Sequence, residues 1–274
     1  MSRARVLYIF HKSLTETIPR LHGLSQVHAL SAGRPFTVVS FEPRLEERTA
    51  SDRAVYHSTR DWLLDAGVDH VAVPVVGTRG LEIPLGALAV LRQVLFRDVR
   101  IIHCRSYIPA LMGMAVSELT PARLLFDMRG LFVDEYIHDG ALREGTLKLA
   151  FVRWLERRLL AASDAIVAVS EAFRRHLLER PDLRDLGLGP RVHVIPNRVE
   201  MERFAEALRR REAARRDRGW QDSVVAVFIG SAAGWHRLDL TMEIMSDVMA
   251  RLPNLRMAAA VYPDADEALR MAER

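Results

Sequence analysis

The sequence predicts an α/β protein with two Rossmann-like parallel-sheet domains, the second of them incomplete. Short apolar segments alternate with longer segments of helical periodicity, which is typical of a parallel sheet covered by helices on both faces. A polar, arginine-rich stretch at 201–217 interrupts this alternation, and a second strand–helix–strand pattern follows it. We expect too little chain after that pattern to complete a second sheet.

Buried strands are predicted where a short apolar run lies between polar or turn-forming residues. In the first domain these runs are 6–10, 36–41, 70–75, 101–104, 124–127, 165–169 and 192–195. Helical patterns lie between most of them, such as 85–95, 108–118 and 142–162. Ligands of such sheets bind beyond the carboxyl ends of the strands, so we expect functional side chains in the loops that follow strands.

The second domain is predicted to open with a strand at 224–228, a helix at 240–252 and a strand at 256–261. The polar segment before it is interpreted as a solvated connecting helix rather than a nucleic-acid-binding arm. We therefore assign 1–198 to the first domain, 199–220 to a connecting helix and linker, and 221–274 to the start of the second domain. A Rossmann-like half needs roughly twice the length of that last segment.

The composition is ordinary for a globular protein, with 49% apolar and 27% charged residues. No apolar run reaches the roughly 18 residues needed to cross a bilayer. The first residues lack a small-residue cleavage site, which favours a buried strand over a signal peptide. Cys104 is the only cysteine, which excludes an intrachain disulfide and a cysteine-based metal site. We expect a cytoplasmic protein.

Arginine supplies nearly all of the positive charge. Lys12 and Lys148 are the only lysines among 39 basic residues, and the net charge is +4. An excess of arginine suits anionic partners such as diphosphates or phospholipid headgroups. Nucleic acid is not expected as a partner, because the sequence shows no helix-turn-helix, RNP or zinc-finger pattern.

Two segments in the middle of the chain end strands with polar residues. Ser170 follows the strand at 165–169 and opens a helix, where it would cap the helix or help to bind an anion. Asn197 follows the strand at 192–195 in a Pro-Asn turn.

These segments resemble the centre of the retaining glycosyltransferases of family 4. The family carries an Asp, an apolar pair and then Val-Ser before a helix, which this sequence matches at Asp164, Ile166, Val167, Val169 and Ser170. The family's Ile-Pro-Asn-Gly-Val-Asp is matched at 195–200, except that Arg198 replaces the Gly and Glu200 replaces the Asp.

The resemblance extends from Val6 to about Val261 and implies the GT-B fold. Residues 1–198 would be the acceptor-side domain, and 221–274 would begin the nucleotide-sugar-binding domain. The implied enzyme is a hexosyltransferase that moves a sugar from a nucleotide-diphosphate-sugar donor to an acceptor hydroxyl with retention, in cell-envelope polysaccharide or glycolipid synthesis. It implies no metal and no other cofactor, since the nucleotide sugar is a substrate and most members need no metal.

The acceptor site is expected at the ends of two consecutive predicted strands. FDMRG at 126–130 resembles a subgroup of the family that carries Asp-Met-Arg-Gly there. These two are the predicted catalytic residues: Asp127 would orient or deprotonate the acceptor hydroxyl, and Arg129 would bind a phosphate or carboxylate in bidentate fashion. An ion pair between these two residues within the loop is the structural alternative. The acceptor-binding residues would be His103, Arg105, Ser106 and Glu135, with His103 alternatively a structural residue.

The donor site is expected to draw on both domains. GSAAGWHR at 230–237 aligns with the family's Gly-Arg, four residues, then Lys-Gly, whose Arg and Lys hold the donor diphosphate. Here Ser231 replaces that Arg, His236 replaces the Lys and Arg237 replaces the Gly. The donor-binding residues by this alignment are Ser170, Asn197, Gly230, Ser231, His236 and Arg237.

In the family, a Glu, seven residues, Glu segment late in the second domain binds sugar and ribose, and this sequence ends at Arg274 before that segment is expected. We therefore expect a truncated donor domain, which alone would bind donor weakly and turn over little unless another chain completes it. Two alternatives stay open: a non-catalytic binding or partner protein, and a sugar-nucleotide epimerase of the same architecture.

The expected partners are a nucleotide-sugar donor and a glycan or lipid-linked acceptor, with peripheral contact to the inner face of the membrane. The helical pattern at 148–160 would supply this contact if Leu149, Val152 and Leu155 formed an interfacial face beside its arginines. We favour packing of these residues in the core over this interfacial face.

Overall fold

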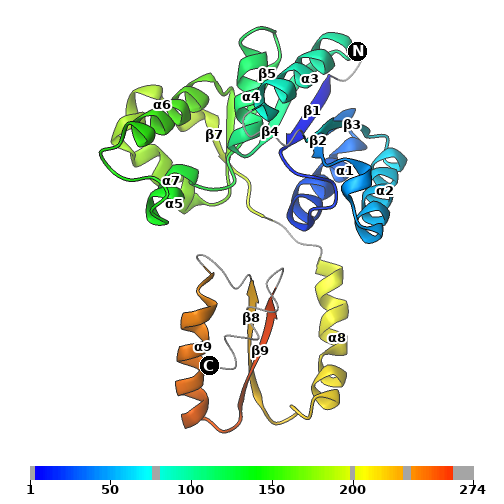
Figure 1. The fold of residues 1–274 in the computed structure, drawn as a ribbon, viewed down its shortest axis with the longest axis vertical. Coiled ribbons are helices and arrows are strands. Elements are labelled where there is room, and N and C mark those ends of the chain that lie inside the picture. The colour runs from blue at the N-terminus through cyan, green and yellow to red at the C-terminus, as the bar shows by residue number, and fades with distance from the viewer. Residues whose placement is uncertain (1–3, 76–80, 198–200, 231–235, 262–274) are drawn as a thin grey trace. The chain divides into compact units, whose positions relative to one another are not determined.

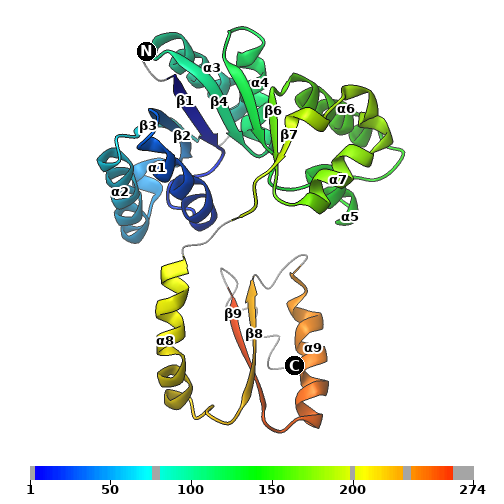
Figure 2. The ribbon, with the colours of Figure 1, turned by 180° about the vertical axis from the view of Figure 1, so that it is seen from behind.

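The computed structural model describes residues 4–75, 81–197, 201–230 and 236–261, except for the side chains of Leu45 and Arg203. The chain forms two compact units, unit 1 (Met1–Val199) and unit 2 (Glu200–Arg274). Each unit contains its own parallel sheet (Figures 1 and 2). The prediction of an α/β chain built on two parallel sheets is confirmed.

The sheet of unit 1 has seven parallel strands in the order β3-β2-β1-β4-β5-β6-β7. Their bounds are Arg5–Phe10 (β1), Phe36–Glu42 (β2), Asp69–Pro74 (β3), Val99–Arg105 (β4), Arg123–Asp127 (β5), Ala165–Ala168 (β6) and Val192–Val194 (β7). Each lies at a predicted apolar run. The order reverses at β1, which pairs with β2 on one side and with β4 on the other. This reversal is the place where doubly wound sheets bind ligands.

Helices connect the strands of unit 1. Their bounds are Pro19–Leu24 (η1, a π-helix), Ser25–Ser31 (α1), Leu45–Glu47 (η2), Ala50–Asp65 (α2), Glu82–Phe96 (α3), Tyr107–Ser117 (α4), Phe132–His138 (α5), Leu147–Ala162 (α6), Glu171–Glu179 (α7), Pro181–Leu186 (η3) and Gly189–Arg191 (η4). The helix predicted at 142–162 begins later, because the hydroxyl of Thr146 caps it by accepting from the amide of Leu149 at 3.3 Å.

The two faces of this sheet carry separate cores. On face 1, strand residues such as Ile9, Ile102 and Phe126 pack against α3, α4, α6 and α7. On face 2, residues such as Tyr8 and Val38 pack against η1, α1 and α2. Alternate residues of one strand therefore belong to different cores, as the period of a β-strand requires.

Unit 2 contains α8 (Met201–Asp217), β8 (Val224–Gly230), α9 (Leu238–Arg251) and β9 (Leu255–Val261). β8 and β9 pair in parallel along their whole length. The predicted polar helix corresponds to α8, in which no described side chain is buried. The assignment of acceptor and donor roles to the two parts of the chain stays a prediction. Within the described residues, no helix combines the length and the hydrophobicity that crossing a bilayer requires.

Candidate functional site

Four polar side chains gather at the carboxyl ends of β1, β4 and β5. Tyr8 pairs in register with His103, and Arg105 pairs in register with Asp127. The rings of Tyr8 and His103 meet edge to face, with their centroids 4.8 Å apart. The spacing of these residues along the strands puts all four side chains on face 2. The structure thus brings together the predicted residues His103, Arg105 and Asp127, and it adds Tyr8.

Asp127 lies at the centre of this cluster with only 3% of its surface exposed. Nη1 of Arg105 lies 3.6 Å from Oδ2 of Asp127, and Nη1 of Arg129 lies 3.6 Å from Oδ1. Nε2 of His103 lies 3.9 Å from Oδ2. The two arginine distances are within ion-pair range, and all three distances are too long for hydrogen bonds. Asp127 and Arg129 therefore form the ion pair within the loop that was the structural alternative, and Asp127 also forms an ion pair with Arg105.

Four buried polar atoms of the cluster have no hydrogen-bond partner among the described residues: Tyr8 Oη, His103 Nε2, Arg105 Nη1 and Asp127 Oδ1. A buried polar atom left unpaired costs on the order of 1–3 kcal/mol. Burial raises the pKa of Tyr8 to about 12, although Arg105 opposes the shift. The Tyr8 hydroxyl therefore keeps its proton at neutral pH. The cluster offers both donors and acceptors to a polar ligand.

The loops that leave β4 and β5 are both strained at a predicted site residue. Ser106 has φ 72° and ψ 177°, and Arg129 has φ 59°. Residues with side chains rarely adopt these conformations, which cost on the order of 1–3 kcal/mol and concentrate at functional sites. The amide of Ser106 donates to the carbonyl of Asp127 at 2.8 Å, which joins the two loops. The Ser106 side chain is exposed and makes no cap for α4.

Arg129 connects the cluster to the segment that follows β7. Its Nη2 donates a hydrogen bond to Oδ1 of Asn197. A predicted acceptor-side residue and a predicted donor-side residue are thus in direct contact within unit 1. Burial lowers the pKa of Arg129, whereas the nearby Asp127 carboxylate raises it.

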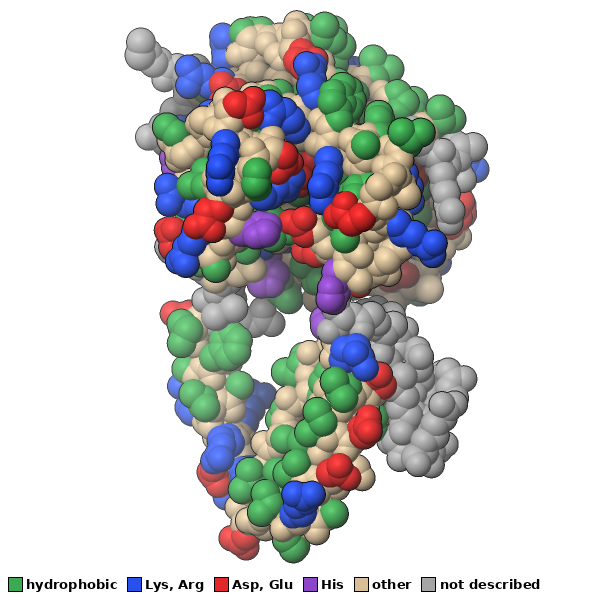
Figure 3. Space-filling view, turned by 90° about the vertical axis from the view of Figure 1, so that its left-hand side faces the viewer, with side chains coloured by type: hydrophobic (Ala, Val, Ile, Leu, Met, Phe, Trp, Pro, Cys, Tyr) green, Lys and Arg blue, Asp and Glu red, His purple; other side chains and the backbone are tan. Residues whose placement is uncertain are grey.

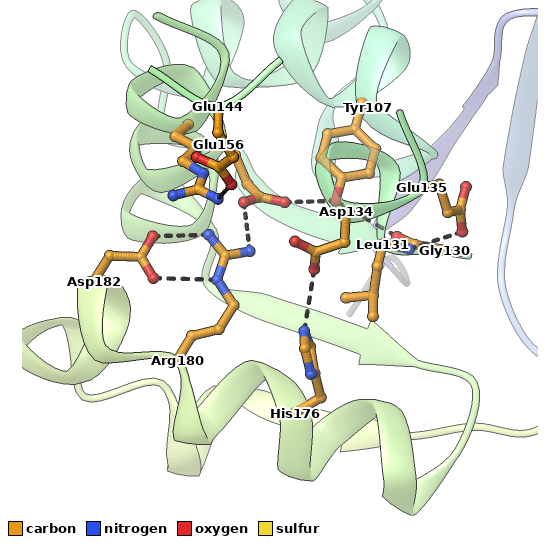
Figure 4. A network of polar contacts seen from close by, with 11 residues as sticks. Tyr107, Gly130, Leu131, Asp134, Glu135, Glu144, Glu156, His176, Arg180 and Asp182 are labelled. Atoms are coloured by element: carbon orange, nitrogen blue, oxygen red, sulfur yellow. Dashed lines mark hydrogen bonds and ion pairs between the residues drawn. The ribbon is translucent and has the colours of Figure 1, made fainter. Parts of the chain in front are cut away.

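Glu135 holds the loop at Gly130 instead of reaching the Asp127 cluster. Its Oε1 accepts a hydrogen bond from the amide of Leu131 at 3.1 Å (Figure 4). A Cβ added to Gly130 would come within 2.6 Å of the same oxygen. The glycine of the predicted motif therefore makes room for Glu135, and the predicted acceptor-binding role of Glu135 stays untested.

A buried network that sequence reasoning missed lies beside this loop (Figure 4). Tyr107 Oη donates to Glu156 Oε1 at 2.8 Å, and Arg180 Nη1 donates to Glu156 Oε2 at 2.6 Å. Arg180 also pairs with Asp182 at 2.8 Å. Glu156 is 2% exposed, and burial raises its pKa against the effect of Arg180. Tyr107 Oη lies 3.5 Å from the Gly130 carbonyl, so this network supports the loop that carries Arg129.

The loop after β1 is anchored on Glu42, a buried residue at the end of β2. Its carboxylate accepts from the Ser13 hydroxyl at 2.6 Å and from the Leu14 amide at 2.9 Å. The Ser40 hydroxyl and the Arg48 guanidinium also donate to it. This four-donor arrangement fixes the loop at the same edge of the sheet as the Asp127 cluster. A second set of buried polar groups thus supports the candidate site.

The other predicted donor-binding residues have local roles in the structure. Ser170 is the N-cap of α7, because its hydroxyl accepts from the amide of Phe173 at 3.1 Å. In unit 2, a Cβ added to Gly230 would come within 2.8 Å of Nδ1 of His236, so the glycine permits this close approach. Arg237 has φ 47° and donates to Asp239 through Nε and Nη2, each at 3.0 Å. Ser231 lies outside the described residues.

Similarity to solved structures shows that the chain has the GT-B fold. It resembles HepE of Anabaena in complex with UDP and glucose (TM-score 0.61, 13% identity, covering 99% of this chain and 65% of that chain). It also resembles sucrose-phosphate synthase of Thermosynechococcus elongatus (TM-score 0.63, 13% identity, covering 99% of this chain and 67% of that chain). A third similar structure is described as a UDP-N-acetylglucosamine 2-epimerase of Listeria monocytogenes (TM-score 0.58, 10% identity, covering 99% of this chain and 66% of that chain). The chain spans about two thirds of the length of these structures.

The family model described as Glycosyltransferase Family 4 matches residues 27–203, which include nearly all strands of unit 1 and the whole Asp127 cluster except Tyr8. The chain therefore belongs to glycosyltransferase family 4. No curated protein sequence matches it.

Proposed function

We propose that this chain acts in the transfer of a sugar from a nucleotide-diphosphate-sugar donor to an acceptor hydroxyl, with retention of anomeric configuration. The observation that carries the proposal is the buried Asp127 carboxylate at the carboxyl ends of β4 and β5. Its Oδ1 accepts no hydrogen bond from the described residues, and Arg105 and Arg129 flank it at ion-pair distance. The UDP and glucose of the similar HepE structure support the donor class.

In the proposed reaction, the bond from the anomeric carbon to the diphosphate oxygen breaks, and a bond from that carbon to the acceptor oxygen forms. Asp127 accepts the hydrogen bond of the acceptor hydroxyl and orients it, and the proton leaves to Asp127 or to the departing diphosphate. Arg105 and Arg129 hold a polar or anionic group of the acceptor, with His103, Ser106 and Glu135 around it.

The donor is assigned to Ser170, Asn197, Gly230, Ser231, His236 and Arg237, which would oppose the charge that develops on the diphosphate. The contact between Arg129 and Asn197 supports this assignment, because it joins the acceptor-side loop to the segment that precedes unit 2. We propose no metal and no cofactor for this reaction.

The proposed setting is the cytoplasmic side of the cell envelope, with hexosyl transfer to a polysaccharide or lipid-linked acceptor and peripheral contact with the inner membrane face. The arginine excess supports an acceptor or surface with phosphate groups.

Two other functions have an observation in their favour. A non-catalytic binding protein is favoured by Asp239, which engages the Arg237 guanidinium that would otherwise be available for a diphosphate. A sugar-nucleotide epimerase is favoured by the similarity to the Listeria structure. An epimerase would convert donor without any acceptor.

The test uses the whole chain with UDP-, GDP- and ADP-hexoses, and it measures donor binding by calorimetry and release of nucleoside diphosphate with and without candidate acceptors. Asp127→Asn should lower acceptor-dependent release by about 100-fold or more while donor binding persists. Asp139→Asn, which changes an exposed acid on the neighbouring loop, is the control. Donor binding without release favours the binding protein, and acceptor-independent conversion of the hexose favours the epimerase.

A further inference from the structure

Two arginines share one carboxylate in the Asp127 cluster. Nη1 of Arg105 and Nη1 of Arg129 each lie 3.6 Å from an oxygen of Asp127. Within the described residues, Asp127 is the only acid at ion-pair distance from either arginine. The single carboxylate compensates one of the two positive charges, so the cluster holds a surplus of one positive charge. A charge that is buried without compensation is costly.

Arginines on the surface of unit 1 have water, and in several cases an acid of their own, beside them. Arg153 pairs with Glu144 at 3.0 Å, for example, and both side chains are in contact with solvent. Figure 3 shows charged side chains of both signs spread over the side of unit 1 that it draws. Arg105 has neither kind of compensation, because it is 8% exposed and shares Asp127 with Arg129. A ligand of the cluster is left to supply the missing negative charge.

The hydrogen-bonding groups of the cluster fit an anion beside a hydroxyl. Tyr8 Oη and Arg105 Nη1 are donors without a partner in the described part of the chain, and Asp127 Oδ1 is an acceptor without one. An anionic group can accept from the two donors, and a hydroxyl can donate to Asp127. Since Arg105 and Asp127 are only 3.6 Å apart, the anionic group and the hydroxyl must be neighbours, as they are on one sugar ring.

The π-helix η1 borders the cluster and adds two residues to it. A Cβ added to Gly23 would overlap the Tyr8 hydroxyl and lie 3.6 Å from Cδ of Arg105, so the glycine lets η1 approach both side chains. Burial lowers the pKa of the half-buried His22, and the charges of Arg105 and Arg129 lower it further, which places its ring near both arginines. π-helical turns are rare and occur frequently at functional sites.

We propose that the acceptor is an acidic sugar, whose carboxylate binds Arg105 and Tyr8 beside η1 while a neighbouring hydroxyl of the same sugar binds Asp127. The inference rests on the proposed function, because it names the class of acceptor for the same site. The side chains of His103 and Arg129 are 20% and 15% exposed, so the sugar enters on their side of the cluster.

A carboxylate fits the cluster better than a phosphate monoester does. Its single negative charge balances the surplus of one positive charge. A phosphate monoester carries up to two negative charges, and the second would face the Asp127 carboxylate without a cation of its own. A carboxylate also matches the planar fork of the Arg105 guanidinium, which can donate two parallel hydrogen bonds to it.

The experiment measures binding of methyl glycosides to the whole chain by calorimetry, in the absence of any donor. Methyl glucuronide and methyl galacturonide are compared with methyl glucoside and methyl galactoside, which carry a hydroxymethyl group in place of the carboxylate. We expect at least one acidic sugar to bind about tenfold or more tightly than its neutral counterpart. Glucose 6-phosphate should bind more weakly than that acidic sugar.

Tyr8→Phe should weaken binding of the acidic sugar about tenfold or more and leave binding of the neutral sugar unchanged, because it removes one donor to the carboxylate. This variant keeps the fold intact, since the Tyr8 hydroxyl bonds to no described residue. Tyr136→Phe is the matched control, because Tyr136 on α5 is 40% exposed. Arg105→Gln should abolish the preference for the acidic sugar, whereas Arg53→Gln, on the exposed side of α2, should keep it.

The ring of His22 gives a second readout. Its pKa, followed by NMR and assigned with His22→Gln, should rise when the acidic sugar binds, because the carboxylate offsets the charges of Arg105 and Arg129. The neutral sugars should leave this pKa where it is.

Equal binding of acidic and neutral sugars, tighter binding of glucose 6-phosphate, or an equal loss in Tyr136→Phe overturns the proposal. Sugar transfer is measured separately, as release of nucleoside diphosphate from added donor. Release that neutral acceptors support and acidic ones do not overturns the inference and leaves the proposed function standing. Binding of the acidic sugar without any release supports the inferred site and counts against sugar transfer.

Discussion

Arg105 and Asp127 face each other in register on β4 and β5, with 3.6 Å between Nη1 and Oδ2, yet no hydrogen bond joins these atoms. The two charges compensate each other across the strands, while Nη1 of Arg105 and Oδ1 of Asp127 make no hydrogen bond to any described residue. If the two side chains satisfied all of each other's hydrogen bonds, the pair would serve only to stabilise the fold. This looser pair keeps an acceptor and a donor for a third group, which is the property expected of a binding site.

Two buried tyrosines near this pair should respond differently to loss of the hydroxyl. Tyr8 Oη has no hydrogen-bond partner in the described part of the chain, so Tyr8→Phe should leave the free energy of unfolding unchanged or raise it by up to about 1 kcal/mol. Tyr107 Oη donates to the Glu156 carboxylate, so Tyr107→Phe should lower it by about 1.5–3 kcal/mol. Urea unfolding followed by circular dichroism measures both. Equal losses would mean that the Tyr8 hydroxyl is bonded in solution.

His70 should make stability depend on pH in the acid range. Its Nε2 lies 2.8 Å from Oγ of Ser40, and burial lowers its pKa from 6.5 to about 4. The unfolded chain then binds a proton at a higher pH than the folded protein does. The free energy of unfolding therefore falls as the pH drops from 6.5 towards 4, by about 3 kcal/mol in all.

The measurement compares urea unfolding at pH 7 and at pH 4.5 in wild type and in His70→Gln. The glutamine can still hydrogen-bond to Ser40 but does not titrate, so His70→Gln should lose this part of the pH dependence. His57→Gln, on the exposed side of α2, should keep the pH dependence of the wild type. An unchanged pH dependence in His70→Gln contradicts the assignment.

Gly113 should not tolerate a side chain. A Cβ at this position of α4 would lie 2.4 Å from Sγ of Cys104 and 2.9 Å from Cδ1 of Leu124, both in the core. Gly113→Ala should therefore destabilise unit 1 by about 1–3 kcal/mol. Gly189→Ala is the control, because nothing lies within 4 Å of its added Cβ. Thermal unfolding distinguishes the two, and a neutral Gly113→Ala would show that the contact between α4 and the sheet is looser than described.

Glu42 should be essential for the loop after β1. Its carboxylate accepts four hydrogen bonds and pairs with the buried Arg48, so Glu42→Gln replaces one acceptor oxygen by a donor and leaves a buried cation without its counter-charge. We expect a loss of about 3 kcal/mol in the free energy of unfolding. Glu47→Gln, which changes an exposed acid in η2, should have no measurable effect. Chemical denaturation of both variants checks this prediction.

The strands were predictable from the sequence because each of them is a short apolar run between polar segments. His103, Arg105 and Asp127 were predictable as neighbours because they end consecutive strands, and their parallel pairing brings those ends together. Tyr8 could not be predicted as part of this cluster, because a tyrosine inside an apolar strand has the same sequence pattern whether or not its hydroxyl makes a hydrogen bond. The role of Glu156 could not be predicted either, because its partner Tyr107 is 49 residues away in the sequence and only the folded chain brings them together. The strain at Ser106 and Arg129 has no sequence pattern, because neither residue is a glycine.

The pairing of β1 with β4 has a consequence for synthesis of the chain. Val6 pairs with Phe36 on one side but with Ile101 on the other. At about 5–20 residues per second, a ribosome needs roughly 5–20 seconds to translate from the first strand to its second partner. During that interval one edge of an almost entirely apolar strand has no neighbour, which is a template for pairing with other nascent chains. Slow translation before residue 105 should therefore favour aggregation, and chaperone binding should be strongest there.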